Sequence, residues 1–296
     1  MKRSDNAYFF LISILLLSVT VTLLGCNRDD ANVLRTVFGV ISSNLAESFV
    51  VSWDEKHQWK AEDYFDDPNV VALCKAIEVK DLRTIDRLIA DGADVNARGK
   101  GNMTPLLWAF PENRPEVFKR LLEHGADPNV VVMSDFNTQG RKIQPGDSVL
   151  YLATISEFPN YFKYVMQHGG DPNLITRQFS PLMMLIGGGF CPDKKEAVQL
   201  LIDAGADLNY RTDTNERALC TSVSAGLFSI TLQLLEAGAD FNFLKEGGST
   251  FVHFLLSSRE RVWSITTLED REYYDKVLEW LKTNGTDLEG ARKDNR

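Results

Sequence analysis

Residue types that support catalysis, metal binding or covalent cross-linking are scarce in this chain of 296 residues. It has 4 cysteines and 4 histidines, too few for a disulfide scaffold and few for a metal enzyme. It contains no GxSxG, P-loop, HExxH or CxxC motif. Anionic side chains outnumber cationic ones, 41 to 32, and phosphate binding requires clustered cations. We therefore expect no metal, no cofactor, no nucleic-acid partner and no enzymatic activity.

Charge is also absent from residues 7–24, which form the longest apolar run of the chain. Lys2 and Arg3 precede this run, and Gly25 and Cys26 end it. A basic start, an apolar stretch and a small residue before a polar segment are typical of an export signal. The alternative is an uncleaved helix, because the stretch is long enough to span a bilayer. Both interpretations place the rest of the chain outside the cytoplasm.

The tetrad of residues 23–26, Leu-Leu-Gly-Cys, resembles the lipobox of bacterial lipoproteins. The resemblance implies that residues 1–25 are removed, that Cys26 is acylated, and that residues 26–33 tether the protein to a membrane. Two or more acyl chains give a stable anchor. Asn27 follows the cysteine, and an Asp there is the usual inner-membrane retention signal, so the resemblance implies the periplasmic side of the outer membrane. Anchoring in the inner membrane is the alternative.

One short phrase recurs along the remaining chain. Its copies are Gly92-Ala93-Asp94-Val95-Asn96, Gly125-Ala126-Asp127-Pro128-Asn129, Gly169-Gly170-Asp171-Pro172-Asn173, Gly205-Ala206-Asp207-Leu208-Asn209, Gly238-Ala239-Asp240-Phe241-Asn242 and the degenerate Gly285-Thr286-Asp287-Leu288-Glu289. The spacings between their first glycines are 33, 44, 36, 33 and 47 residues. A period of this size indicates an array of stacked repeats.

Each copy of the phrase follows an amphipathic segment with helical spacing, such as residues 117–122. Glycine is suited to end that helix because it takes a left-handed conformation without strain, and Asp and Asn favour the turn that follows. Thr104 and Pro105 then provide a cap and a first residue for the next helix. Each unit is therefore predicted to be a turn, a short helix, a second turn and a longer helix.

These two signatures together resemble the ankyrin repeat, whose units combine Thr-Pro-Leu-His with Gly-Ala-Asp-Val-Asn. The resemblance implies an all-α solenoid of about six helix-turn-helix units, with β-hairpin fingers, over residues 67–290. The first unit is expected to begin at Asp67 and Pro68. Residues 34–66 are expected to cap the open end of this unit, mainly through Trp53, Trp59, Tyr64 and Phe65.

Three departures from the 33-residue spacing predict insertions. Eleven extra residues lie between Asn129 and Ser148, where the resemblance implies a finger, so one finger is expected to be elongated. Extra residues near 187–192 are expected between the helices of the fourth unit. A longer insertion, near 259–273, is expected to separate the helices of the last unit.

The histidines and cysteines have structural interpretations that we favour over chemical ones. His124 and His168 precede the terminal glycine of a long helix, where a cation interacts favourably with the helix dipole. A proton-transfer or metal site is the alternative. His253 matches the ankyrin motif histidine, which implies a structural hydrogen bond. Cys74, Cys191 and Cys220 are expected to be free thiols, although Cys191 and Cys220 lie in adjacent units.

The finger edge of the array is the candidate binding surface, because the resemblance implies that ankyrin fingers and short helices hold protein partners. Its predicted cations are Arg98, Lys100, Arg141, Lys142, Arg177, Arg211 and Lys245. Its predicted apolar contacts are Trp108, Phe136, Phe179, Met183 and Phe243. Cations gathered on one edge of an acidic protein favour an acidic partner. The alternative is that finger residues are polar because they are exposed, and that Trp108 and Met183 pack between repeats.

The resulting functional hypothesis is a monomeric, membrane-tethered binding protein. Ankyrin-repeat lipoproteins resemble proteins associated with lipase effectors of the type VI secretion system. That resemblance implies an immunity protein that neutralises an antibacterial phospholipase in the periplasm. An envelope scaffold that supports a periplasmic stress-protection enzyme is the alternative, and an enzyme with an unrecognised site is a third.

Overall fold

The computed structural model describes residues 57, 59–137, 142–156, 158–188, 191, 193–244 and 248–293. The chain divides into two compact units, Met1–Ser52 and Trp53–Arg296, and all described residues belong to the second. The predicted signal segment, the lipidation residue Cys26 and the tether lie outside the described residues. Within the described part, no helix has both the length and the apolar character needed to cross a membrane.

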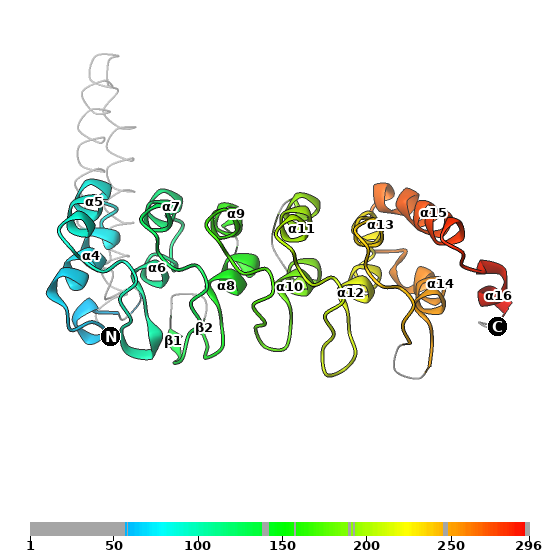
Figure 1. The fold of residues 1–296 in the computed structure, drawn as a ribbon, viewed down its shortest axis with the longest axis horizontal. Coiled ribbons are helices and arrows are strands. Elements are labelled where there is room, and N and C mark those ends of the chain that lie inside the picture. Colours follow the sequence, from blue (N-terminus) through cyan, green and yellow to red (C-terminus); the bar gives the residue numbers. More distant parts are fainter. Residues whose placement is uncertain are drawn as a thin grey trace, which may run out of the picture. The chain divides into compact units, whose positions relative to one another are not determined.

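The described part of the chain is a row of six helix pairs followed by one terminal helix (Figure 1). The inner helices are α4 (Pro68–Glu78), α6 (Pro105–Trp108), α8 (Val149–Ile155), α10 (Pro181–Gly188), α12 (Ala218–Ser224) and α14 (Phe251–Val262). The outer helices are α5 (Leu82–Ala90), α7 (Pro115–Glu123), α9 (Pro159–Gln167), α11 (Lys194–Asp203), α13 (Phe228–Glu236) and α15 (Leu268–Thr283). Helix α16 (Leu288–Lys293) ends the row. The predicted all-α repeat solenoid with about six units is confirmed.

The helix starts predicted at Asp67 and Thr104 are confirmed by side-chain caps, and Ser148 and Thr250 provide the same kind of cap. Asp67, Thr104, Ser148 and Thr250 each accept a hydrogen bond from a backbone N–H in the first turn of the helix that follows. Such a bond satisfies one of the N–H groups that have no partner within the helix. Proline occupies the first position of α4 and α6, where its missing N–H removes no helical bond.

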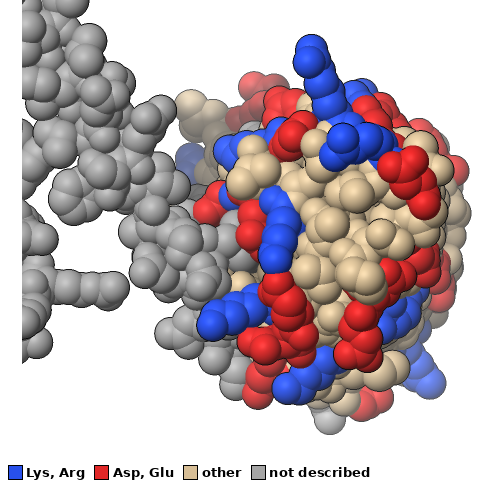
Figure 2. Space-filling view, turned by 90° about the vertical axis from the view of Figure 1, so that its left-hand side faces the viewer, with Lys and Arg blue, Asp and Glu red and all other residues tan. Residues whose placement is uncertain are grey.

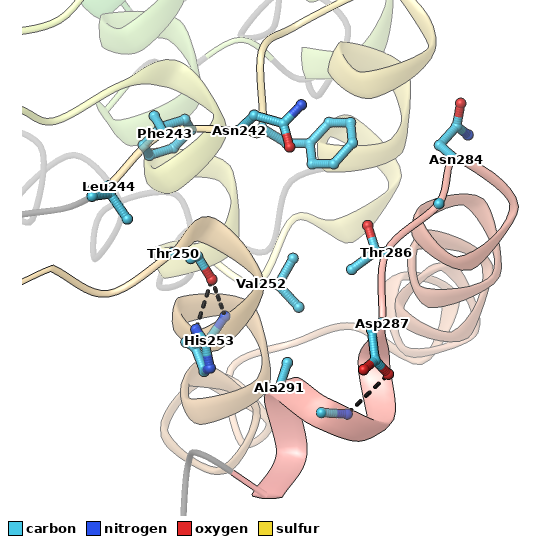
Figure 3. A pocket seen from close by; sticks show the side chains of 13 residues that line it. Asn242, Phe243, Leu244, Thr250, Val252, His253, Asn284, Thr286, Asp287 and Ala291 are labelled. Carbon is cyan, nitrogen blue, oxygen red and sulfur yellow. Dashed lines mark hydrogen bonds between the residues drawn. The ribbon is translucent and has the colours of Figure 1, made fainter.

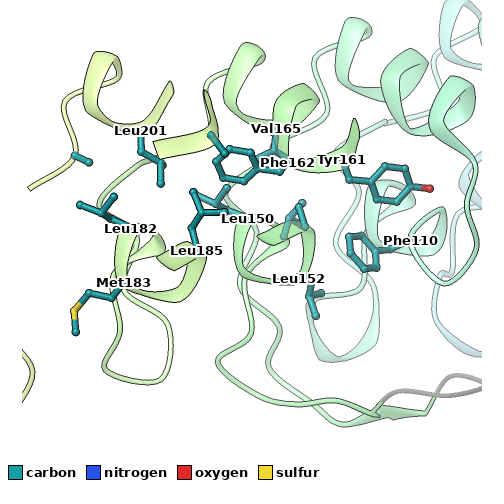
Figure 4. Close-up of a cluster of buried hydrophobic side chains, with 14 of the residues drawn as sticks. Phe110, Leu150, Leu152, Tyr161, Phe162, Val165, Leu182, Met183, Leu185 and Leu201 are labelled. Atoms are coloured by element: carbon teal, nitrogen blue, oxygen red, sulfur yellow. The ribbon is translucent and has the colours of Figure 1, made fainter. Parts of the chain in front are cut away.

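A continuous apolar core runs along the row, between inner and outer helices and between neighbouring pairs (Figure 4). At the second junction the ring of Phe118 on α7 stacks on Tyr161 of α9, with ring centroids 4.1 Å apart. The hydroxyl of Tyr161 donates to the carbonyl of Glu112 and accepts from the N–H of Arg114. Burial raises the pKa of Tyr161 well above its usual value. Each pair therefore buries the apolar face of the next, as expected for a stacked array.

The insertions show two confirmed positions and one error. The elongated connection forms a hairpin of β1 (Phe136–Asn137) and β2 (Lys142–Ile143), paired antiparallel. The extra residues of the fourth unit lie between α10 and α11. The last insertion does not separate its helices as predicted: it lengthens them, because α14 continues to Val262 and α15 begins at Leu268. Long amphipathic helices bury more apolar surface at the end of a stack than a loop could, which accounts for the difference.

The segment before the first repeat covers the inner side of the first two pairs. It includes the short 3-10 helix η1 (Ala61–Asp63). The ring of Trp59 is 2% exposed and lies 5.3 Å from Trp108 and 6.1 Å from Phe136. Tyr64 and Phe65 also pack against Trp108, whereas capping of the open end of the first unit by this segment stays a prediction, and Trp53 lies outside the described residues. At this end of the row an uncharged area is bordered by side chains of both signs (Figure 2).

Candidate protein-binding edge

The repeated Gly-x-Asp-x-Asn phrase forms the turn that starts each finger. Its first glycine has a positive φ in all six copies, for example 81° at Gly125. A side chain would be strained there, so glycine is required. In the five complete copies, the Asp carboxylate accepts a hydrogen bond of 2.8 to 2.9 Å from the backbone N–H of the Asn two residues later. The local sequence thus fixes the direction in which each finger leaves its helix.

A ladder of asparagine side chains joins each turn to the next. The amide of Asn173 donates to the carbonyl of Gly205 at 3.0 Å and accepts from the N–H of Asp207 at 2.7 Å. Asn96 and Asn129 make the same pair of bonds to the turns that follow them. Asn209 accepts the N–H of Asp240 at 2.8 Å. Because the donors and acceptors recur at the same place in each unit, the ladder sets a regular spacing between fingers.

Neighbouring fingers also bond to each other near their tips. Asn102 and Asn215 have positive φ values of 66° and 59°, and each side chain donates to a carbonyl of the next finger. Asn is among the few residues that tolerate this conformation. These bonds hold successive tips in one row, so the fingers present a continuous edge.

The third finger, residues 174–180, ends in a two-residue turn. Thr176 and Phe179 pair as an isolated bridge, and the two residues between them, Arg177 and Gln178, have φ values of 50° and 69°. Two consecutive positive φ values match the tight hairpin turn that usually contains Asn or Gly. The guanidinium of Arg177 bonds to the buried carboxylate of Asp147 at 2.8 Å, which supports the turn. Strained, well-supported backbone of this kind concentrates at functional sites.

The predicted cations fall into three groups. Arg98 and Arg177 form ion pairs with carboxylates of the neighbouring finger, Asp127 and Asp147. Lys100 and Arg211 are exposed, and the described residues include no ion-pair partner for either. Arg141 and Lys245 lie outside the described residues, as does the side chain of Lys142. The cations therefore split between bridging fingers and facing solvent.

The structure corrects most of the predicted aromatic contacts. Trp108, Phe136 and Phe243 are 0%, 3% and 7% exposed, so they are core residues that the finger edge does not display. Their burial has specific causes. Trp108 and Phe136 pack against Trp59, and Phe243 lies under the guanidinium of Arg217 at 4.4 Å. Met183 is also buried. Phe179, at 41% exposed, is the predicted ring that the finger edge displays.

Sequence reasoning missed the aliphatic residues of this edge. Met133, Ile175 and Leu244 are 72%, 40% and 61% exposed, and each lies in a finger. A signal was present, because each is a large apolar residue in a connection where polar residues are usual. With Phe179 they form the edge patch: Met133, Ile175, Phe179 and Leu244. Exposed apolar side chains that recur along one edge mark an interaction surface more strongly than scattered ones.

Asp86, His124 and His253 have structural partners. His124 ends α7 and its Nε2 lies 2.8 Å from the carboxylate of Asp86 on α5, which also pairs with Arg120. These hydrogen bonds lower the pKa of Asp86. His253 Nδ1 lies 2.7 Å from the hydroxyl of Thr250, which confirms its predicted structural bond. Cys74, Cys191 and Cys220 are not joined in disulfides, and the described residues include no group of three potential metal ligands.

Comparison with known proteins finds ankyrin repeats in the chain. Residues 73–176 match the family model for ankyrin repeats, in three copies. This range covers the helix pairs from α4 to α9 and the first two fingers. Residues 73–176 are thus ankyrin repeats within an all-α repeat solenoid, and the ankyrin fold typically serves as a non-enzymatic module for protein–protein interaction.

Two curated proteins are similar over short ranges. The palmitoyltransferase AKR1 of Lachancea kluyveri is 32% identical over 130 residues, which are 44% of this chain and 16% of that protein. The mitochondrial disaggregase of Bos taurus is 39% identical over 59 residues, 20% of this chain and 9% of that protein. The chain spans under a fifth of the length of each matched relative. The similarity is one of repeats, and the activities in those names do not transfer with it.

Proposed function

We propose that this protein binds another protein along its finger edge. The observation that carries the proposal is the edge patch of Met133, Ile175, Phe179 and Leu244, held on rigidly spaced fingers. A pre-organised surface loses little conformational entropy on binding, so more of its contact energy contributes to affinity. The exposed cations Lys100 and Arg211 favour an acidic partner and increase its association rate.

The proposal extends to where the protein acts. The lipobox-like tetrad supports a lipid anchor at Cys26 and a position outside the cytoplasm, with the repeat array facing the periplasm. A tethered, rigid recognition surface suits capture of an incoming toxin. We therefore include the finer proposal that the protein neutralises a secreted antibacterial phospholipase as an immunity protein.

The binding edge is tested by substitutions that leave the core intact. Ile175→Ala with Phe179→Ala should weaken binding of a purified phospholipase effector by about tenfold or more, since exposed anchors of an interface often contribute above 1 kcal/mol. Lys100→Glu with Arg211→Glu should lower the association rate, and more so at low salt. The matched controls are Ile265→Ala and Arg83→Glu, exposed residues away from the fingers. Equal affinities for all variants would overturn the assignment of the edge.

The anchor and the biological role need separate experiments. Cys26→Ser should abolish acyl labelling of the protein in cells, and persistent labelling would contradict the lipobox assignment. Deletion of the gene should make cells sensitive to the phospholipase, and the finger variant should fail to restore protection. Full resistance of the deletion strain would reject the immunity role while leaving protein binding in place.

A further inference from the structure

The last junction of the array has a pocket at the place where earlier junctions have the bonds of the asparagine ladder. A cavity of about 510 Å³ lies between the turn of the fifth finger, residues 241–244, and the terminal turn, residues 284–287. Thr250, Val252, His253, Gly290 and Ala291 complete its lining. Its volume is within the usual range for ligand pockets, roughly 300 to 1,000 Å³. Figure 3 shows Asn242 and Thr286 on opposite sides of this space.

The pocket separates groups that meet directly in the earlier junctions. Upstream, Asn96, Asn129 and Asn173 each bond the Gly carbonyl and the Asp N–H of the next turn. The equivalent groups at the end of the array are Asn242, Gly285 and Asp287. Among the described residues, no hydrogen bond joins the Asn242 side chain to either of them, and the side chain has no other partner.

The chain after the terminal turn explains why this space is open. Asp287 accepts hydrogen bonds from the N–H groups of Glu289 and Gly290, so the chain enters α16 at once. In the earlier units the chain instead continues into a finger that packs beside the preceding one. Helix α16 instead packs against α14 and α15, at the level of the inner helices (Figure 1), so among the described residues no finger lies beside the fifth one on this side.

We propose that this pocket binds an extended peptide segment of a protein partner. A peptide unit carries one N–H and one C=O, so an inserted strand can bond the Asn242 amide on one side and the Gly285 carbonyl on the other. Addition of a strand by backbone bonding is a common mode of peptide recognition. The inference deepens the proposed protein-binding function, on which it rests, by adding a second contact that shares Leu244 with the edge patch.

The lining also defines the chemistry of the peptide. Phe243, Leu244, Val252 and Ala291 provide an apolar wall that suits an aliphatic or aromatic side chain. Asp287 is the charged residue of the lining, and no lysine or arginine lines the pocket. A neutral or cationic peptide therefore fits, and an acidic one does not. This preference is opposite to that of the edge cations, so the two contacts would recognise different parts of one partner.

The test uses a phage-displayed library of short random peptides selected on the full chain. Selected peptides should be apolar and free of acidic residues. Asn242→Ala and Ala291→Trp should each weaken their binding by about tenfold, through loss of a hydrogen bond and through filling of the pocket. Asn69→Ala, an exposed asparagine on α4, is the matched control and should leave affinity unchanged.

A second measurement uses the unaltered protein, so it does not require a substituted variant to fold. The side-chain amide resonance of Asn242 should shift when a selected peptide is added, and that of Asn173 should not. No selected peptide, or binding that neither pocket variant weakens, would overturn the inference. The proposed function fails separately, if the finger variants bind the phospholipase as tightly as the unaltered protein.

Discussion

The first and last junctions of the array bury apolar surface near the two ends of the stack by different means. At the first, an aromatic cluster fills the space between segment 59–65, α6 and the elongated finger, and Trp59 and Trp108 are at most 2% exposed. At the last, α14 and α15 are lengthened to 12 and 16 residues, and a pocket remains beside α16. Terminal repeats lack a neighbour on one side and require special closure. The comparison shows that closure by packing and closure by helix extension leave different surfaces.

The outer helices of the two junctions are also joined differently. At the first, Asp86 on α5 pairs with Arg120 and His124 of α7, and its side chain is 39% exposed. At the last, Asp270 on α15 is 7% exposed and accepts hydrogen bonds from both the N–H and the hydroxyl of Ser229. Exposed ion pairs contribute little to stability, whereas a buried carboxylate with several donors is costly to remove. We therefore expect the second attachment to be the stronger one.

Removal of the aromatic core at the first junction should have the largest effect. Trp108→Ala deletes a ring that is 0% exposed and lies 5.3 Å from Trp59 and 5.5 Å from Tyr64. The loss in free energy of unfolding should be about 3 to 5 kcal/mol, from lost burial and the cavity left behind. Urea denaturation of the full chain, followed by far-UV circular dichroism, measures it.

The matched substitution at the last junction is Val252→Ala. Val252 is 7% exposed and lines the terminal pocket, so its removal enlarges an existing space. We expect a loss of about 1.5 kcal/mol, the value of two buried methylene-sized groups. Equal losses for the two variants, after allowance for side-chain size, would contradict the distinction between a filled and an open end.

Loss of the buried hydrogen bonds that attach α15 to α13 should have the second largest effect on stability. Asp270→Ala leaves the N–H and hydroxyl of Ser229 without their acceptor, and the hydroxyl of Thr267 also loses its bond of 3.0 Å. Loss of hydrogen bonds to a charged group should reduce stability by about 2 to 3 kcal/mol. Thermal unfolding measures it. Glu269→Ala, one residue earlier and exposed, is the control and should have little effect.

Hydrogen exchange shows whether that loss is local. Amide protection should fall in α13 and α15 and remain in α4 to α7, because each repeat contacts mainly its neighbours. Uniform loss of protection along the array would show that the junction is not an independent unit.

The comparison also shows which features the sequence could predict. The caps at Asp67, Thr104, Ser148 and Thr250 and the turns after each glycine depend on bonds within a few residues, so the local pattern was sufficient. The burial of Trp108, Phe136 and Phe243 depends on side chains far away in the sequence, such as Trp59 and Arg217. A single sequence carries no record of those contacts.

The last insertion was misjudged for a related reason. Residues 259–273 depart from the repeat, and such a departure predicts a connection. Val262 within this range and Tyr274 directly after it are in fact buried in lengthened helices, at 5% and 3% exposed. The pocket could not be predicted either, because no sixth finger follows the fifth among the described residues and because the placement of α16 is not encoded by local pattern.

Removal of the exposed ion pair at the first junction should have the smallest effect on stability, and the size of that effect should depend on pH. Hydrogen bonds from His124 and Arg120 lower the pKa of Asp86 in the folded protein. The stabilising contribution of ionised Asp86 is therefore fully present above the pKa of the unfolded chain, about 3.9. It is lost as the pH falls through the pKa of Asp86 in the folded protein. Asp86→Asn should reduce the free energy of unfolding by under about 1 kcal/mol at neutral pH, because the pair is solvent-screened. The difference from the unaltered protein should shrink in acid, as urea denaturation at several pH values can show.

Asp91→Asn, an exposed carboxylate without an ion pair among the described residues, should change stability by under about 0.5 kcal/mol throughout. A difference for Asp86→Asn that grows as the pH falls would mean that the pair destabilises the first junction, and that the aromatic cluster alone holds it closed.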